Sequence, residues 1–207
     1  TYNGELTLSR FPLDRFLTVD SLGSASANFR LEGRYFSWPQ AKTSVNAGIR
    51  QLFYKEHEYK DITLQATLDK THLRGTMVSK DPDAPLDVVF RGDSLQQQYQ
   101  VGLGGYIGKV DLQALHLMQE PLTMGLKVDL QGFIGEHSAY ALKARFDSLS
   151  MADSRKTYTL GSLDIDMASD LKKTTLDVKT GDLQLTFRAD TSLAGLGRVL
   201  GKLQGLS

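Results

Sequence analysis

The four histidines are the residues best suited to acid–base chemistry or metal binding, but their spacing favours neither. They are His57, His72, His116 and His137. No two of them stand at metal-ligand spacing, and none lies in an HExxH or similar frame. The spacing therefore predicts histidines that are exposed or hydrogen-bonded, on turns and on the solvated faces of strands.

A glycine-rich stretch from Gly102 to Lys109 imitates a phosphate-binding loop. A P-loop needs a glycine five residues before its Gly-Lys pair and a hydroxyl after it, and these positions hold Leu103 and Val110. A dinucleotide fingerprint that starts at Gly102 would need its third glycine where Ile107 stands. We interpret these residues as turn or bulge glycines.

Two pairs of acidic residues look like fragments of calcium loops. Asp81-x-Asp83 and Asp164-x-Asp166 both lack the following glycine and the distal glutamate of an EF-hand. Alternation places Asp164 and Asp166 on the solvated face of a strand, and we prefer this solvated-face interpretation to a calcium loop. No serine or threonine stands in a glycine elbow. The sequence thus predicts no catalytic residue, metal site or cofactor, and we expect the protein not to be an enzyme.

Composition narrows the partners further. The 207 residues include 24 acidic and 24 basic side chains, so the formal net charge is zero and nucleic acid is not an expected partner. The chain has no cysteine, which is compatible with either the cytoplasm or the periplasm. No apolar run is long enough to span a bilayer. Because the chain opens at Thr1 without a signal peptide, we expect it to be an excised piece of a longer protein.

Hydrophobic periodicity predicts strands with one apolar and one solvated face. Ile62 to Leu68, Leu126 to Leu130, Tyr140 to Phe146 and Leu183 to Phe187 all alternate between apolar and polar residues. Half-solvated strands are typical of antiparallel sheets. Turn residues separate the alternating segments, as in Lys80–Pro85 and its counterpart Thr180–Asp182. Short helical segments are predicted at Pro12–Leu17, at Asp111–Leu117 and in the glycine-rich tail.

The chain also repeats itself after about 99 residues. Phe29-x-Leu31-x-Gly33 returns as Val128-x-Leu130-x-Gly132. Tyr59 followed by Leu64, Ala66 and Leu68 returns as Tyr158 followed by Leu163, Ile165 and Met167. Leu86-x-Val88-x-Phe90-Arg91-x-Asp93 returns as Leu183-x-Leu185-x-Phe187-Arg188-x-Asp190. Such repetition is typical of scaffolds and conduits.

This pattern predicts an all-β fold, an elongated antiparallel sheet built from two repeats of about 99 residues with one or two short helical segments. We place the first repeat at 1–96 and the second, continuous with it, at 97–196. Residues 197–207 are rich in glycine and are expected to form a short amphipathic helix or a truncated end.

Three stretches together resemble the repeat region of the TamB family, which is related to the AsmA-like bridge proteins of double-membraned bacteria. Asp111 to Gly132 resembles a "DLxAL…PLxxxxxxxxxG" unit. Tyr158 to Ile165 resembles a "YxLxSLxI" strand. Tyr59 to Gly92, which contains Asp81-Pro82 and Phe90-Arg-Gly92, resembles a "YKxIxLxG…DP…FxG" unit. The similarity covers about 1–196 and looks nearest to proteins of the Bacteroides type.

The resemblance implies a sheet curled into a trough, often called a β-taco, in the periplasmic part of a protein anchored to the inner membrane outside this segment. It implies a role in moving phospholipid or another acyl-chain lipid towards the outer membrane, in assembly of outer-membrane β-barrel proteins, or in both. Combined with the apolar stripe, it implies that lipid tails contact a set of trough-lining residues: Leu64, Ala66, Leu68, Val128, Leu130, Leu142, Phe146, Leu163, Ile165, Leu183, Leu185 and Phe187.

Periodicity alone leaves other interpretations open. The stripe could be the filled core of a sheet packed on another layer. The chain could also form a closed β-sandwich that acts as a surface adhesion or carbohydrate-binding module. Its single tryptophan, Trp38, lies close to Tyr35 and Phe36 and is the candidate sugar platform.

Overall fold

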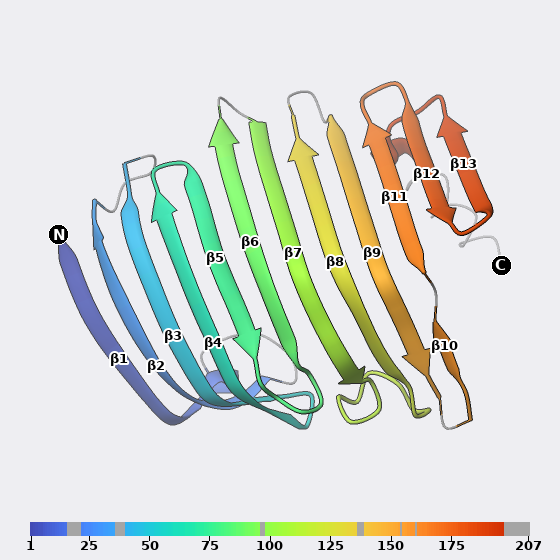
Figure 1. The fold of residues 1–207 in the computed structure, drawn as a ribbon. Helices are drawn as coiled ribbons and strands as arrows, with labels where there is room; N and C mark the ends of the chain where they lie inside the picture. The colour runs from blue at the N-terminus through green and yellow to red at the C-terminus, as the bar shows by residue number, and fades with distance from the viewer. Residues whose placement is uncertain are drawn as a thin grey trace.

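The computed structural model describes residues 1–15, 22–35, 40–95, 98–135, 139–153, 155–159 and 161–196. These residues form one antiparallel β-sheet of 13 strands that does not close on itself (Figure 1). The prediction of an all-β protein built on an elongated antiparallel sheet is confirmed. The described residues also form a 3-10 turn at η1 and one turn of helix at 193–196.

Most strands are long, and β4, β8, β9 and β13 contain the alternating segments predicted from the sequence. The elements are β1 (Tyr2–Pro12), η1 (Leu13–Arg15), β2 (Leu22–Arg34), β3 (Lys42–Tyr54), β4 (His57–Asp69), β5 (His72–Ser79), β6 (Leu86–Leu95), β7 (Gln98–Asp111), β8 (Thr123–Ile134), β9 (Tyr140–Ala152), β10 (Thr157–Thr159), β11 (Ser162–Ser169), β12 (Thr174–Thr180) and β13 (Leu183–Ala189).

The sheet is a meander in which each long strand pairs with the next one along the chain. β11 follows β9 in the order of strands, and the short β10 also pairs with β9. Within the described residues, β1 and β13 have one neighbour each and form the two edges of the sheet. One open sheet is a different architecture from the closed β-sandwich of the alternative interpretation, which needs two packed sheets.

The internal repeat is visible in the strand register. Phe29, Ala47 and Leu64 stand opposite one another on β2, β3 and β4. Residues 99 positions later, Val128, Phe146 and Leu163, stand opposite one another on β8, β9 and β11. The adjacent row on the same face, two residues along each strand, is repeated too. Leu31, Val45 and Ala66 pair in the first repeat, and Leu130, Ala144 and Ile165 pair at the equivalent positions of the second. Sequence repetition therefore corresponds to repeated pairing.

Residues with positive φ interrupt several strands at a similar distance from the strand end. Arg10, Asp61 and Ser148 have φ values of 47°, 51° and 55°. Register shifts accompany Arg10 on β1 and Ser148 on β9. Asp61 lies where β3 and β4 keep a single register. Leu52 on β3 stands opposite Ala25 on β2 and opposite Tyr59 on β4. The bulges keep one face apolar along strands longer than a single alternating run.

Two irregular segments lie at the end of the sheet that carries the bulges (Figure 1). The loop 80–85 lies between β4 and β7, where Lys80 N donates to Asp61 O and Gly108 N donates to Pro85 O. The segment 112–122 follows β7 and buries Leu115. Where a short helical turn was expected at Asp111–Leu117, the chain forms a series of turns in which Leu115 N donates to Asp111 O. Asp111 Oδ1 begins them and accepts from the N–H groups of Gln113 and Ala114.

Other sequence expectations have varied outcomes. The glycines of 102–108 lie inside β7, where Gly105 has φ of 146° and a register shift follows Ile107. The turn at Thr180–Asp182 is present, with Gly181 at φ of 52°. Of the helical turn expected at Pro12–Leu17, Leu13–Arg15 is a 3-10 turn, and residues 16–17 lie outside the described part of the chain. Phe36, Trp38, His137 and the tail 197–207 also lie outside it.

In the described ranges, no helix has the length and hydropathy required to cross a membrane.

Candidate functional site

Cross-strand pairing collects the apolar side chains into three parallel rows, each of which crosses twelve strands. The Val88 row is Leu6, Phe29, Ala47, Leu64, Met77, Val88, Gly105, Val128, Phe146, Leu163, Thr180 and Leu183. The Phe90 row is Gly4, Leu31, Val45, Ala66, Gly75, Phe90, Leu103, Leu130, Ala144, Ile165, Val178 and Leu185. The Gly92 row is Tyr2, Gly33, Thr43, Leu68, Leu73, Gly92, Val101, Gly132, Leu142, Met167, Leu176 and Phe187.

We call these three rows the apolar face. Residues that pair directly, and residues two apart on a strand, project to the same side of a sheet. None of the three rows contains an aspartate, glutamate, lysine, arginine or histidine. The face is therefore a continuous hydrophobic surface and not a series of separate patches.

All of the trough-lining residues predicted from the sequence fall in these rows. The Val88 row contains Leu64, Val128, Phe146, Leu163 and Leu183. The Phe90 row contains Ala66, Leu130, Ile165 and Leu185, and the Gly92 row contains Leu68, Leu142 and Phe187. The structure brings the whole set together on one side of one sheet.

Sequence reasoning missed the strands that alternate weakly. β3, β5 and β7 contribute Val45, Met77 and Leu103, with alanine, glycine or threonine at neighbouring positions of the same face. Small residues hide an alternating pattern because they carry little hydrophobicity. The strand pairing, which places Leu103 beside Phe90 and Leu130, is the signal that identifies them.

Exposure varies in an orderly way over the apolar face. Side chains in the centre of the Val88 row are the deepest, and Val88 itself is 5% exposed. The Gly92 row lies nearer the open end of the strands, and Val101 there is 46% exposed. Leu6 on β1 and Leu183 on β13 are also exposed, because edge strands have a neighbour on one side only. The face is thus deep in its centre and accessible at two edges and one end.

An aromatic ring covers one of the glycines of the apolar face. A Cβ added to Gly75 would lie 2.2 Å from Cζ of Phe90, its direct cross-strand partner. The Phe90 ring therefore occupies the space that a side chain at position 75 would take. This contact joins β5 to β6 near the middle of the sheet and fixes the Phe90 rotamer.

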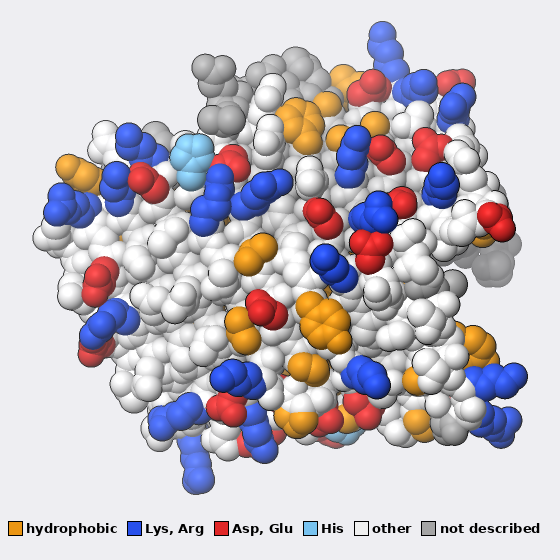
Figure 2. Space-filling model, viewed as in Figure 1, with side chains coloured by type: hydrophobic (Ala, Val, Ile, Leu, Met, Phe, Trp, Pro, Cys, Tyr) orange, Lys and Arg blue, Asp and Glu red, His pale blue; other side chains and the backbone are white. Residues whose placement is uncertain are grey.

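The opposite face is polar. Figure 2 shows lysine, arginine, aspartate and glutamate side chains spread over the strands of this face. Cross-strand ion pairs organise part of it: Arg30 Nε lies 2.8 Å from Glu5 Oε1, and Arg74 Nη2 lies 2.8 Å from Asp93 Oδ1. Hydrogen bonds from His72 and Arg74 hold the pKa of Asp93 below its ordinary value.

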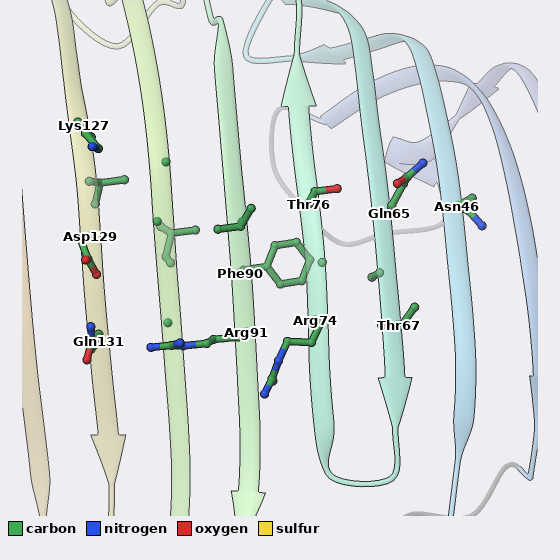
Figure 3. Close-up of a pocket in the computed structure, with 18 of the residues that line it drawn as sticks. Asn46, Gln65, Thr67, Arg74, Thr76, Phe90, Arg91, Lys127, Asp129 and Gln131 are labelled. Carbon is green, nitrogen blue, oxygen red and sulfur yellow. The ribbon is translucent and has the colours of Figure 1, made fainter.

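The polar face carries a hollow of about 890 Å³ over β3 to β8 (Figure 3). Gly102 and Gly104 of β7 line it, and Arg91 reaches across β7 towards Gln131. Arg74, Lys127 and Asp129 also line it, so its charge is mixed. The lining offers hydrogen bonds to water or to a polar ligand.

The acidic pairs and histidines singled out from the sequence lie in different surroundings. Asp164 and Asp166 lie on the polar face, where Arg145 Nη1 is 3.8 Å from Asp164. His72 is exposed and hydrogen-bonded to Asp93 at 2.6 Å. His57 is hydrogen-bonded through Nδ1 to Ala114 O but is largely buried, and Asp81 is buried rather than solvated.

Comparison with known proteins adds no relative from which a site could be transferred. No protein-family model, no curated protein and no solved structure matches the chain.

Proposed function

We propose that the apolar face binds the acyl chains of lipids and lets them slide along the sheet. The observation that carries this proposal is the uncharged character of all three rows across twelve strands. Monomeric soluble proteins rarely expose contiguous apolar patches of more than a few hundred Å², so a face of this size needs a hydrophobic occupant.

The dimensions of the face suit an acyl chain. Twelve strands at about 4.8 Å spacing span about 50 Å, and three rows along the strands cover about 13 Å. One leaflet of a bilayer is about 15 Å of hydrocarbon. A lipid tail therefore fits along the strands at many equivalent positions, or across three to four strands.

The chemistry of the face favours transport over tight storage. Each buried methylene contributes about 0.8 kcal/mol, which retains a tail without any hydrogen bond. Because the rows hold no charged group, every position offers a similar environment, and small barriers separate neighbouring positions. Headgroups would remain at the accessible end near Leu73 and Val101.

The whole protein in this proposal is a TamB-like or AsmA-like bridge. It would be anchored in the inner membrane outside this segment, act in the periplasm and carry lipid towards the outer membrane. The resemblance in the sequence motifs supports this setting, and the single curled sheet built from two repeats is the fold that the resemblance implies.

The test is transfer of a fluorescent phospholipid between vesicles, with Leu185→Asp compared with Gln184→Asp. Both positions are exposed on β13, but Leu185 belongs to the apolar face and Gln184 to the polar face. We expect Leu185→Asp to slow transfer several-fold and Gln184→Asp to leave it unchanged. Equal rates for the two variants would contradict the proposal.

A second candidate function rests on the open edges. β1 and β13 each present one unpaired side among the described residues, and an unpaired edge can accept a strand from an unfolded outer-membrane protein. In that case a proline scan of β13 should abolish capture of the client, whereas Leu185→Asp should have little effect. The reverse order of effects would exclude edge pairing as the main activity.

A further inference from the structure

A buried histidine and two aspartates meet at the bulged end of the sheet. The ligand atoms of His57, Asp81 and Asp83 all lie within 4.8 Å of one another. The three residues come from β4 and from the loop 80–85, which fills the gap between β4 and β7. They lie outside the three rows of the apolar face, so the proposed lipid function does not use them.

The hydrogen bonds around His57 define the role of each ring nitrogen. Nδ1 lies 3.1 Å from the carbonyl oxygen of Ala114, which can only accept, so Nδ1 carries a proton and donates. Nε2 is buried and has no hydrogen-bond partner. The side chain is 10% exposed, and Nε2 is directed at Asp81 Oδ2, 3.6 Å away.

Asp81 is equally well prepared to be a ligand. Its side chain is 2% exposed. Oδ1 accepts from the N–H groups of Asp83 and Ala84, and Oδ2 accepts from Lys60 N at 2.8 Å. These donors hold the carboxylate in place and leave one lone pair of Oδ2 free on the side of His57. Burial, and after it the charge of Asp81, raises the pKa of the nearby Tyr59.

A nitrogen lone pair that faces a buried carboxylate at this distance is repulsive unless a positive charge lies between them. The separation of 3.6 Å exceeds the usual range of about 2.7–3.2 Å for a hydrogen bond from nitrogen to oxygen. Two metal–ligand bonds of about 2.0–2.2 Å that meet at a tetrahedral angle place their outer atoms about 3.4 Å apart. The gap therefore suits a metal ion better than a single proton.

The geometry points to a binding site for a zinc-like divalent transition-metal ion, held by His57 Nε2, Asp81 Oδ2 and a carboxylate oxygen of Asp83. One imidazole and two carboxylates suit zinc or manganese better than calcium, which prefers oxygen ligands alone. The carbonyl of Ala114 on Nδ1 is the outer partner that metal-binding histidines commonly have. A water molecule would complete the coordination on the half-exposed side of Asp83.

The second repeat shows that the sheet does not require this cluster. Lys156 stands 99 residues after His57, and the short turn around Gly181 replaces the loop 80–85. The strand register is nevertheless shared between the repeats. A metal ion would join β4, the loop 80–85 and, through Ala114, the segment after β7, which is a connection that strand pairing does not provide.

The experiment is calorimetric titration of the whole chain, stripped with a chelator, with Zn²⁺ and then with Mn²⁺ and Ca²⁺. Three variants are compared: His57→Gln, Asp83→Asn and, as control, His72→Gln. His72 also touches an aspartate, but it is half-exposed and hydrogen-bonded directly to Asp93 at 2.6 Å. The half-exposed Asp83 gives a variant that folds even if His57→Gln does not.

We expect one Zn²⁺ per chain in the wild type and in His72→Gln, with weak or no binding of Ca²⁺. Asp83→Asn should weaken Zn²⁺ binding by at least about tenfold, the range that even outer partners of metal sites produce, and His57→Gln should abolish it. Zn²⁺ should also raise the Tm of the wild type and of His72→Gln but not that of His57→Gln. Absence of Zn²⁺ binding in the wild type, binding unaffected by Asp83→Asn, or binding lost in His72→Gln would each overturn the proposal.

Discussion

β6 and β13 carry the same sequence pattern in two different surroundings. Leu86, Val88 and Phe90 on β6 correspond to Leu183, Leu185 and Phe187 on β13, 97 residues later. β6 pairs with β5 and β7, whereas β13 pairs with β12 alone among the described residues. Val88 is 5% exposed, but Leu185 is 57% exposed.

The alternating pattern determines on which face a side chain lies, and the number of neighbouring strands determines how deeply that side chain is buried. In both strands, alternation and pairing with the neighbouring strand place these side chains on the apolar face. Only a central strand receives contacts from both sides. A repeated sequence therefore contributes a stable centre in one copy and an accessible edge in the other.

The largest expected effect is the contrast between Val88→Asp and Leu185→Asp. A charge at the buried Val88 should lower the free energy of unfolding by about 3 kcal/mol or more, whereas Leu185→Asp should cost below about 1 kcal/mol. Urea unfolding of both variants measures this difference. Equal costs would mean that another surface covers β13 in solution, and a dependence on protein concentration would identify that surface as a second copy.

Phe90 on β6 and Phe187 on β13 differ in the same way. Phe90 packs over Gly75, whereas Phe187 stands opposite Leu176 at the exposed edge. We expect Phe90→Ala to cost about 2–3 kcal/mol and Phe187→Ala about 1 kcal/mol. Thermal and denaturant unfolding of the two single variants measure this. A smaller loss for Phe90→Ala than for Phe187→Ala would show that the ring over Gly75 is not a stabilising contact.

The connections into the two strands also differ. β5 and β6 are joined by the loop 80–85, but β12 and β13 are joined by a tight turn in which Gly181 has φ of 52°. Gly181→Ala should therefore cost about 1 kcal/mol, and Gly181→Asn about half as much, because asparagine tolerates the left-handed region better. Chemical denaturation of the two variants tests the order, which would be reversed if the turn rearranged.

The smallest expected effect is on the acid side of the pH–stability curve. The folded-state pKa of Asp93 on β6 is lowered by His72 and Arg74. Its ionised form therefore stabilises the fold above the ordinary aspartate value of about 3.9, and this contribution is lost as the pH falls through the lower folded-state value. Asp93→Asn should flatten the decline in stability below about pH 4. A double variant, His72→Gln with Arg74→Gln, should flatten it in the same way, and an unchanged slope in both would refute the assignment.

Much of the sheet could be predicted because alternation is a local property. The alternation of Leu64, Ala66 and Leu68 identifies their face within five residues. The offset of 99 identifies which strands occupy equivalent positions. The positive-φ positions could not be predicted, since Asp61 and Ser148 adopt positive φ without a glycine or another local signal. Only pairing with the adjacent strands imposes that conformation.

The His57–Asp81 contact was beyond prediction for a different reason. The residues are 24 positions apart and meet because β4 extends past the end of β5, so that the loop 80–85 folds against the base of β4. Asp81 looked like an ordinary turn residue beside Pro82. Its burial depends on the relative lengths of strands, which no short motif encodes.

The central claim is that the apolar face contacts lipid, and photocrosslinking tests it most directly. A photoreactive amino acid is placed at Leu130, in the middle of the Phe90 row, and at the adjacent Gln131 on the polar face. After irradiation in cells that produce the protein, mass spectrometry identifies the adducts. The account predicts lipid adducts at position 130 and none at position 131. Equal adducts at both positions, or only protein adducts at position 130, would contradict it.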